Sequence, residues 1–428
     1  MTAKPKENRH SSNKHEALEN SCSVLPSTWT ASTIGNVVVK TKQRDPRNSP
    51  NEVFQYVDVS SVSNESFRIT GSSPVLGSDA PSRARKAIAK NDILFATVRP
   101  TLKRIALVPE ELNGEIASTG YCILRADAAK VDSSFLYFSL LTDTFTARMA
   151  SIERGVSYPA VSDGDVLASK LILPPLPEQK KIAQILSTVQ RAIEAQEQII
   201  QTTTELKKAL MHKLFTEGLR NEPQKQTEIG LIPESWTVIT IGDLGKCVTG
   251  STPKTENLSY YDPPSEDFVA PADLGARRYI YNSDKKISPD GMATIRVLPK
   301  NAVMCVCIGS SIGKVGMAFK DQSATNQQIN SIICSENRDP NFVFYLLSYL
   351  ALYWRGFATF GPVPILSKGR FTTIPIAVPH LLLEQKDIAR PFLALDTKIE
   401  IAEKKVASLQ DLFRTLLHDL MTATTRVH

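Results

Sequence analysis

The sequence predicts an α+β protein with an internal repeat, in which two similar mixed domains are each followed by a long helix. The repeat is visible in two motifs. Residues 25–30 (LPSTWT) return as 232–237 (IPESWT), and residues 178–180 (EQK) return as 384–386. A period of about 200 residues is far longer than a solenoid repeat, so it indicates duplication of a whole folding unit. Two similar but unequal halves suit a target with two similar but unequal halves.

The third observation is a change of periodicity within each half. Residues 25–174 contain short apolar runs such as 53–59 and 92–98, which are typical of strands, and one helix is predicted at 133–146. From residue 176 the pattern becomes helical. The predicted boundaries, in chain order, are a disordered tail (1–24), a first mixed domain (25–174), a central long helix (175–220), a linker (221–231), a second mixed domain (232–379) and a distal long helix (380–424).

Both long helices carry a heptad stripe of apolar residues, interrupted in the central helix by Gln196, Thr203 and Lys207. Because an exposed stripe would aggregate, we expect the two helices to form an antiparallel coiled coil with an approximate internal two-fold axis. Pro391 is expected to kink or restart the distal helix. The candidate residues for helix pairing or partner docking are Ile182, Leu186, Val189, Ile193, Ile388, Phe392, Leu395, Ile399, Val406 and Phe413.

Length and composition fit an ordinary globular chain. The 428 residues allow two or three domains with their own cores, and the net charge of +6 permits a polyanionic partner without requiring one. No signal peptide is recognisable, and the longest apolar run, 342–354, is too short to span a bilayer. We expect a cytoplasmic protein with no membrane contact. No Cys or His pair complements Cys305 and Cys307, so a metal site is not expected.

Searches for a catalytic site fail. Residues 309–314 (GSSIGK) resemble a P-loop, but one residue between the glycines is missing and Val315 replaces the required Ser or Thr. Residues 262–265 (DPPS) lack the aromatic residue of amino-methyltransferase motifs, and 178–180 lack the Asp of a nuclease site. None of the histidines lies in a mixed domain, which argues against His-dependent catalysis there. The sequence therefore favours a binding protein with no catalytic residues.

Two groups of residues could contact DNA. In the first domain, residues 83–104 are strongly basic, and such a density can neutralise several phosphates, although a solvated basic face would look the same. In the second domain, residues 326–330 (NQQIN) carry amides of the kind that pair with adenine edges, but a turn is the alternative. The candidates are Arg83, Arg85, Lys86, Arg99, Lys103, Arg104, Ser310, Ser311, Lys314, Asn326, Gln327, Gln328, Asn330 and Lys368.

With the repeat, the helices and the amides together, the chain resembles the specificity subunit of type I restriction–modification enzymes from residue 25 to 422. The segments typical of that family are 174–183 (PPLPEQKKIA) with its degenerate copy 379–389, 309–314, 326–330, and the Pro-x-x-Ser patterns at 159–162 and 364–367. The resemblance implies two target-recognition domains, each reading one half of a split asymmetric site in double-stranded DNA, with the long helices between them acting as a ruler.

The resemblance also implies partners. Two methyltransferase subunits would dock on the helices, and two ATP-driven restriction subunits would join them, so that the chain directs adenine methylation and restriction in a bacterial or archaeal cytoplasm. The chain itself would hold no cofactor, whereas its partners would use S-adenosylmethionine, ATP and Mg²⁺. The alternative is a non-catalytic coiled-coil scaffold whose mixed domains bind proteins. A recognition half fused to a catalytic chain is a second alternative, and the absence of any cofactor motif argues against it.

Overall fold

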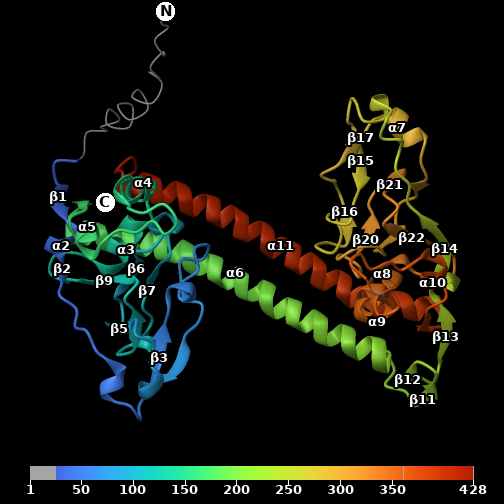
Figure 1. Cartoon of the computed structure of the whole chain (residues 1–428), viewed down its shortest axis with the longest axis horizontal. Helices are drawn as coiled ribbons and strands as arrows, with labels where there is room; N and C mark the ends of the chain where they lie inside the picture. Colours follow the sequence, from blue (N-terminus) through green and yellow to red (C-terminus); the bar gives the residue numbers. More distant parts are fainter. Residues whose placement is uncertain (1–25, 360, 428) are drawn as a thin grey trace, which may run out of the picture. The chain divides into compact units, whose positions relative to one another are not determined.

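The computed structural model describes residues 26–359 and 361–427, so the predicted disordered tail, 1–24, lies outside the described part. The chain divides into two compact units. The first contains residues up to Gln196 and from Lys404 onward, and the second is Glu197–Glu403. Each unit consists of one mixed domain and the adjoining ends of two long helices (Figure 1). The predicted α+β class and the internal repeat are confirmed.

The mixed domain of the first unit contains two small sheets and a separate antiparallel strand pair. The pair is β1 (Thr30–Thr33) with β10 (Lys170–Leu173). One sheet has the order β2 (Val38–Val39), β9 (Tyr121–Ala126), β6 (Ile93–Ala96) and β7 (Ile105–Leu107). The other has the order β4 (Ser73–Leu76), β3 (Val53–Val57), β8 (Ile116–Ser118) and β5 (Ala84–Ala87). The helices are α2 (Ile34–Val37), α3 (Ser133–Leu141), α4 (Asp143–Ile152) and α5 (Asp163–Leu167).

The second unit repeats this order, and one of its two sheets has five strands instead of four. Strand β13 (Trp236–Thr240) pairs with β23 (Pro375–Pro379). One sheet is β14 (Gly245–Thr249), β22 (Ile329–Cys334), β19 (Val303–Val306), β20 (Val315–Ala318) and β16 (Tyr279–Ile280). The other is β17 (Lys286–Ile287), β15 (Glu266–Val269), β21 (Ser323–Thr325) and β18 (Val297–Leu298). The helices are α7 (Pro289–Ala293), α8 (Pro340–Tyr349), α9 (Ala351–Arg355) and α10 (Lys368–Thr372).

Two local predictions are corrected. The single helix expected at 133–146 is two helices, α3 and α4. Thr142 between them has extended backbone, and its hydroxyl accepts a hydrogen bond from the amide of Phe145, which starts a new helix. The linker expected at 221–231 contains a hairpin of β11 (Gln224–Thr227) and β12 (Gly230–Pro233). Its turn is closed by the Thr227 hydroxyl, which donates to the carbonyl of Gly230.

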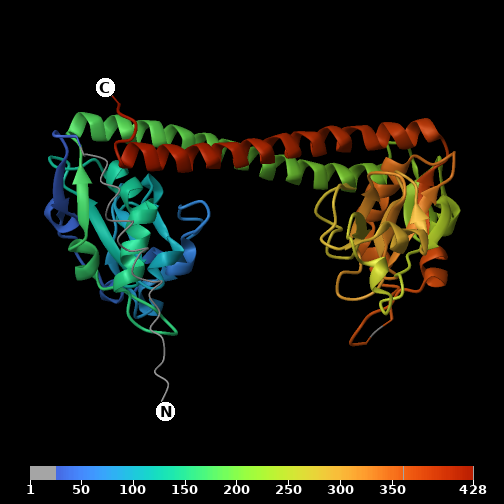
Figure 2. The same ribbon diagram turned by 90° about the horizontal axis from the view of Figure 1, so that it is seen from above.

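The two long helices are α6 (Leu176–Glu217) and α11 (Leu382–Met421), and in each unit they run along one side of the mixed domain (Figure 2). None of the heptad-stripe positions is exposed on either helix. In the first unit, Leu186 near the start of α6 shares a core with Phe413 near the end of α11. In the second unit, Phe215 at the end of α6 stacks on Phe392 near the start of α11, with ring centroids 5.7 Å apart. The ends that meet show that the helices pair antiparallel.

Pro391 does not interrupt the distal helix, contrary to the sequence-based expectation. The α11 helix runs through it without a break. A proline inside a helix costs about 3 kcal/mol, because it removes a backbone hydrogen bond and its ring clashes with the preceding turn. Its neighbours Ile388 and Phe392 are fully buried in the core of the second unit, and each contributes about 1.5–3 kcal/mol. Tertiary packing therefore outweighs the local cost.

The repeated motifs fasten each long helix to its own domain. The indole N–H of Trp29 donates to Glu178 at 3.2 Å, and that of Trp236 donates to Glu384 at 3.1 Å. Both carboxylates are buried at the start of a long helix, where the helix dipole favours negative charge. In each copy, the tryptophan of the first motif therefore binds the glutamate of the second.

The glutamine of each motif makes a second connection. The side-chain oxygen of Gln179 accepts from the amide of Asp132 at 2.9 Å, and that of Gln385 accepts from the amide of Asp339 at 3.0 Å. These two aspartates are the N-caps of α3 and α8. Each long helix is thus hydrogen-bonded to the start of the first large helix of its domain. These bonds help to fix the orientation of the mixed domain on the helix within each unit.

Each buried glutamate also binds an arginine that follows the other long helix. Arg426 contacts Glu178 at 2.9 Å with a half-buried side chain, whereas Arg220 lies 3.8 Å from Glu384 and is exposed. We expect Arg426→Ala to lower the free energy of unfolding of the first unit by about 1.5–3 kcal/mol. Arg220→Ala should cost the second unit less than about 1 kcal/mol. Urea unfolding followed by hydrogen exchange in each unit measures both, and equal losses would contradict this reading.

Candidate nucleic-acid interface

Most cations of the basic segment in the first domain are engaged with carboxylates. Arg85 pairs with Asp45, and Lys86 pairs with Asp163 at 2.5 Å. Lys90 pairs with Glu110. These acids come from other parts of the domain, so the segment is much less cationic in the fold than in the sequence.

Two further candidates hold the fold together. The ammonium of Lys103 donates to the carbonyl of Leu141 at 3.1 Å and to the carboxylate of Asp143 at 2.7 Å, at the junction of α3 and α4. The guanidinium of Arg104 donates to the carbonyl of Val62 at 2.6 Å. Both side chains therefore have structural partners that they would have to leave to contact DNA.

Arg83 and Arg99 are different, because within 26–359 and 361–427 neither makes an ion pair, and both are exposed. Arg99 has a left-handed backbone with φ of 49°, and its guanidinium lies over the ring of Tyr158 at 5.3 Å. Its backbone amide donates to the carbonyl of Pro159 at 2.7 Å. No sequence pattern marks Tyr158, although it directly precedes the Pro-x-x-Ser pattern at 159–162.

The amide run of the second domain divides into structural and available side chains. Asn330 is buried in β22 and accepts a hydrogen bond from the hydroxyl of Thr249 at 2.7 Å. Asn326 and Gln328 bond to each other across a turn. Gln327 is exposed, and the hydroxyl of Thr252 donates to it at 2.5 Å. Of the four candidates, Gln327 is the one whose side chain faces solvent.

We therefore predict that the side chain of Asn330 stabilises the fold and does not read DNA. Asn330→Ala should lower the free energy of unfolding by about 1–2 kcal/mol, because the Thr249 hydroxyl loses its acceptor inside the sheet, and the recognised DNA sequence should not change. Gln327→Ala is the matched control and should leave stability within about 0.5 kcal/mol. Thermal unfolding and the methylation pattern of the assembled enzyme test both variants. A changed DNA preference in Asn330→Ala, with normal stability, would make Asn330 a base contact instead.

The glycine-rich segment 309–314 is a turn between β19 and β20, with positive φ at Gly309 and Gly313. Together with α6, α9 and α11 it lines a cavity of about 650 Å³ in the second unit, to which Ser310, Ser311 and Lys314 contribute. The cavity wall holds five cations and three carboxylates. The list of charged wall residues is Lys207, Arg277, Arg278, Lys314, Arg355, Asp396, Glu400 and Glu403.

Several of these wall charges neutralise each other. Lys207 pairs with Asp396 at 2.5 Å, and Arg277 lies 3.4 Å from Glu403. The ammonium of Lys314 is 3.5 Å from the carbonyl oxygen of Pro271. These two ion pairs leave Arg278, Lys314 and Arg355 with a single remaining wall carboxylate, Glu400, so the wall keeps a modest surplus of positive charge.

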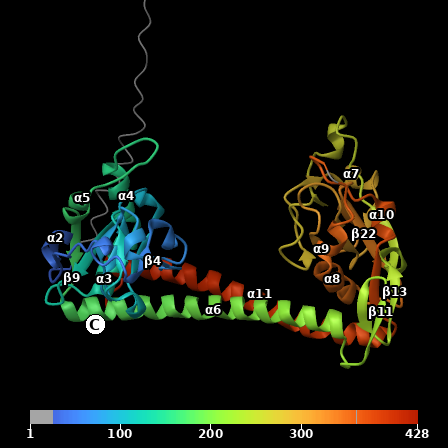
Figure 3. The same cartoon turned by 60° about the horizontal axis from the view of Figure 1, so that its bottom comes forward.

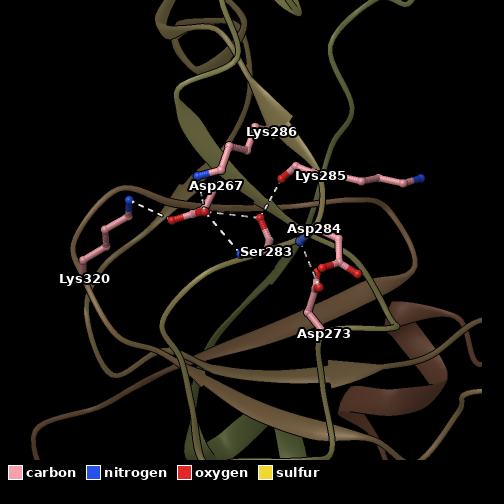
Figure 4. Close-up of polar contacts among 7 residues, drawn as sticks. All are labelled: Asp267, Asp273, Ser283, Asp284, Lys285, Lys286 and Lys320. Atoms are coloured by element: carbon pink, nitrogen blue, oxygen red, sulfur yellow. Dashed lines mark hydrogen bonds and ion pairs between the residues drawn. The ribbon is translucent and has the colours of Figure 1, made fainter. Parts of the chain in front are cut away.

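Other lysines of the second domain are used to hold a buried acid. Asp267 lies on β15, opposite Lys286 of the neighbouring strand β17. Its carboxylate accepts hydrogen bonds from the ammonium groups of Lys286 at 3.2 Å and Lys320 at 3.1 Å (Figure 4). The amide of Ser283 adds a third bond at 3.2 Å. Burial alone would raise the pKa of Asp267, but these hydrogen bonds and the two lysines hold it below its usual value. This cluster ties β15 to β17 and to the loop between β20 and β21.

The described residues contain no group of His, Cys, Asp and Glu arranged to hold a metal ion. The thiols there are free, and burial raises the pKa of Cys122 and of Cys307 to about 12, so they stay protonated. Among the described helices, none combines the length and the apolar character needed to cross a membrane.

A family model described as the type I restriction modification DNA specificity domain matches the chain twice, over residues 26–205 and 233–411. Each match covers one mixed domain and much of its long helix. The type I restriction enzyme HindI specificity subunit of Haemophilus influenzae is 24% identical, over 90% of this chain and 98% of that protein. The putative MjaX specificity subunit of Methanocaldococcus jannaschii is also 24% identical, over 94% and 95%.

Solved structures show the same architecture. A chain from a structure that describes complex assembly and conformational transition of the type I R-M system has 25% identity and a TM-score of 0.52, over 92% of this chain and 98% of that one. The S subunit of a type I restriction–modification system from M. genitalium has 17% identity and a TM-score of 0.60, over 92% and 97%. The second likeness concerns the fold alone.

Proposed function

We propose that this chain, which belongs to the type I restriction–modification DNA specificity family, reads a split asymmetric DNA site and directs adenine methylation and ATP-dependent restriction by its partner subunits. Membership makes it a DNA-recognition subunit without catalysis of its own, working with modification and restriction subunits. Beyond family membership, we propose that the recognised site is split and that two methyltransferase subunits and two restriction subunits join this chain. These partners would use S-adenosylmethionine, ATP and Mg²⁺.

The observation that carries the proposal is that the same backbone is built twice with different surface chemistry. Arg99 in the first domain follows strand β6, and Gly309 in the second follows the corresponding strand β19. Helix α5 begins Asp163-Gly164-Asp165, whereas α10 begins Lys368-Gly369-Arg370. Equal folds with unequal surfaces would place two readers with different base preferences on one chain, which is what an asymmetric split site requires.

Methylome sequencing of a host that carries this chain with its methyltransferase subunit tests the proposal. We expect one methylated motif with two specific halves separated by a fixed unspecific spacer. Exchange of residues 25–174 for the corresponding domain of another family member should then change one half only. Methylation that lacks a split motif, or an exchange that changes both halves, would contradict the two-reader model. Absence of methylation together with binding of other proteins would favour a scaffold.

A further inference from the structure

Both mixed domains build the same loop junction, which we call the tip. In the first domain, Val98 forms an antiparallel bridge with Ala160, and in the second, Ile308 forms one with Ile365. The next residue along each strand donates its amide to a proline carbonyl: Arg99 to Pro159, and Gly309 to Pro364 at 2.9 Å. Both bridged loops then lead into the short helix, α5 or α10, whose N-cap is the serine of the Pro-x-x-Ser pattern. The two tips are therefore equivalent positions of the repeat.

The first tip combines an unpaired cation with exposed apolar side chains. The Arg99 guanidinium lies over Tyr158, whose side chain is 73% exposed, and Val156 on the same loop is fully exposed. Figure 3 shows the loop after α4 projecting from the side of its domain opposite α6. Nothing within the described ranges covers these side chains. Contact between a guanidinium and an aromatic ring is most favourable when the pair is buried. Here the guanidinium of Arg99 and the ring of Tyr158 both remain in contact with water.

The second tip carries the same kinds of group on different elements. Gly309 supplies no side chain, but Val363 and Ile365 are exposed at 58% and 42%. The first residue of α10, Lys368, is an exposed cation without an ion pair among the described residues. Its counterpart in α5, Asp163, is an acid that Lys86 neutralises. The exposed cation therefore follows a strand in the first copy, as Arg99, and begins the short helix in the second copy, as Lys368.

We propose that the two tips are the DNA-contacting edges, with Arg99, Tyr158 and Val156 serving the first half-site and Lys368, Val363 and Ile365 serving the second. The inference rests on the proposed function and names the residues that carry it out. DNA is the occupant that fits both chemistries. A guanidinium binds phosphate or the major-groove edge of guanine, and an exposed ring or aliphatic side chain packs on sugars and bases.

The test uses the purified complex with its methyltransferase subunits and fluorescent duplexes that carry the methylated motif, or the motif with one half scrambled. Arg99→Gly is the informative variant, because it gives the first tip the residue of the second tip and accepts the left-handed backbone without strain. We expect binding to the motif to weaken about tenfold or more, and the dependence on salt to fall by about one unit. Tyr158→Ala should weaken binding, and Tyr158→Phe should retain it. Lys368→Ala should weaken binding in the same assay and reduce the penalty for scrambling the second half only.

Lys170→Ala is the control, since Lys170 is an exposed lysine of β10 in the same domain, without an ion pair among the described residues and outside both the tip and the DNA-contact candidates. Its loss should change affinity less than twofold. Thermal unfolding of each variant separates loss of fold from loss of contact. If the wild-type complex discriminates the motif from scrambled duplexes but Arg99→Gly and Tyr158→Ala bind normally, the tips are not the contact edges. An equal loss in Lys170→Ala would also overturn the assignment. A wild-type complex that does not discriminate would sink the proposed function itself.

Discussion

Lengthening both long helices by seven residues is expected to widen the recognised spacer by about three base pairs and to leave both half-site sequences unchanged. Seven residues add about 10 Å to a helix and preserve its heptad stripe. Three base pairs of B-DNA have about the same length. The effect requires that the helix pair sets the separation of the two DNA-reading domains, which the resemblance implies and this variant tests.

The structure shows where the insertions belong. Because α6 and α11 pair antiparallel, an insertion in one helix alone would leave the stripe positions of the inserted residues without a facing helix. Each helix must therefore receive an insertion. Thr203 and Ala402 are buried stripe positions of the second unit, and both have small side chains that tolerate local repacking. Insertions after these two residues keep the flanking pair Lys207–Asp396 in register.

The matched control inserts seven residues after Thr203 alone, which should abolish or weaken methylation rather than shift the motif. Methylome sequencing reports the spacer directly. An active double-insertion variant that still methylates the original spacing would show that the helices are a docking surface and not a ruler.

The architecture was predictable because its signals are periodic and repeated. Heptad stripes such as the one from Ile388 to Leu420 extend over ten positions of helix, so one misplaced residue cannot hide them. The exceptions were local. Pro391 was misread because its cost is intrinsic to the backbone, whereas the packing of Phe392 that overcomes it is tertiary. The helix break at Thr142 was not predicted, because it depends on capping by a single side chain. A threonine inside one continuous helix would fit the sequence equally well.

The candidate interface was less predictable than the fold, because charge in a sequence does not show its partners. Lys86 and Lys103 counted as phosphate contacts, yet their carboxylates, Asp163 and Asp143, lie far along the chain. The same limit applies to Asn330, whose partner Thr249 is on a neighbouring strand. Conversely, Tyr158 carries no signal by itself, and it becomes notable only when the bridge between Val98 and Ala160 brings it to Arg99.

Phe392→Ala should be the most destabilising single substitution considered for the second unit, lowering its free energy of unfolding by about 3–5 kcal/mol. The ring is fully buried. Its centroid is 5.7 Å from that of Phe215 on α6 and 5.0 Å from that of Tyr345 on α8. Removing it leaves a cavity where both long helices and the mixed domain meet. It also removes the packing that offsets the cost of Pro391.

Hydrogen exchange resolved by peptide is the appropriate measurement, because a chain with two units need not unfold in one step. Protection should fall across residues 197–403 and persist in residues 26–196. Leu383→Ala, an exposed leucine of the same helix, is the control and should change stability by less than about 0.5 kcal/mol. A second variant, Phe392→Ala with Pro391→Ala, should recover part of the loss, since the helix then regains its backbone hydrogen bond. If the double variant were no more stable than Phe392→Ala, the account of how packing overrides the proline would be wrong.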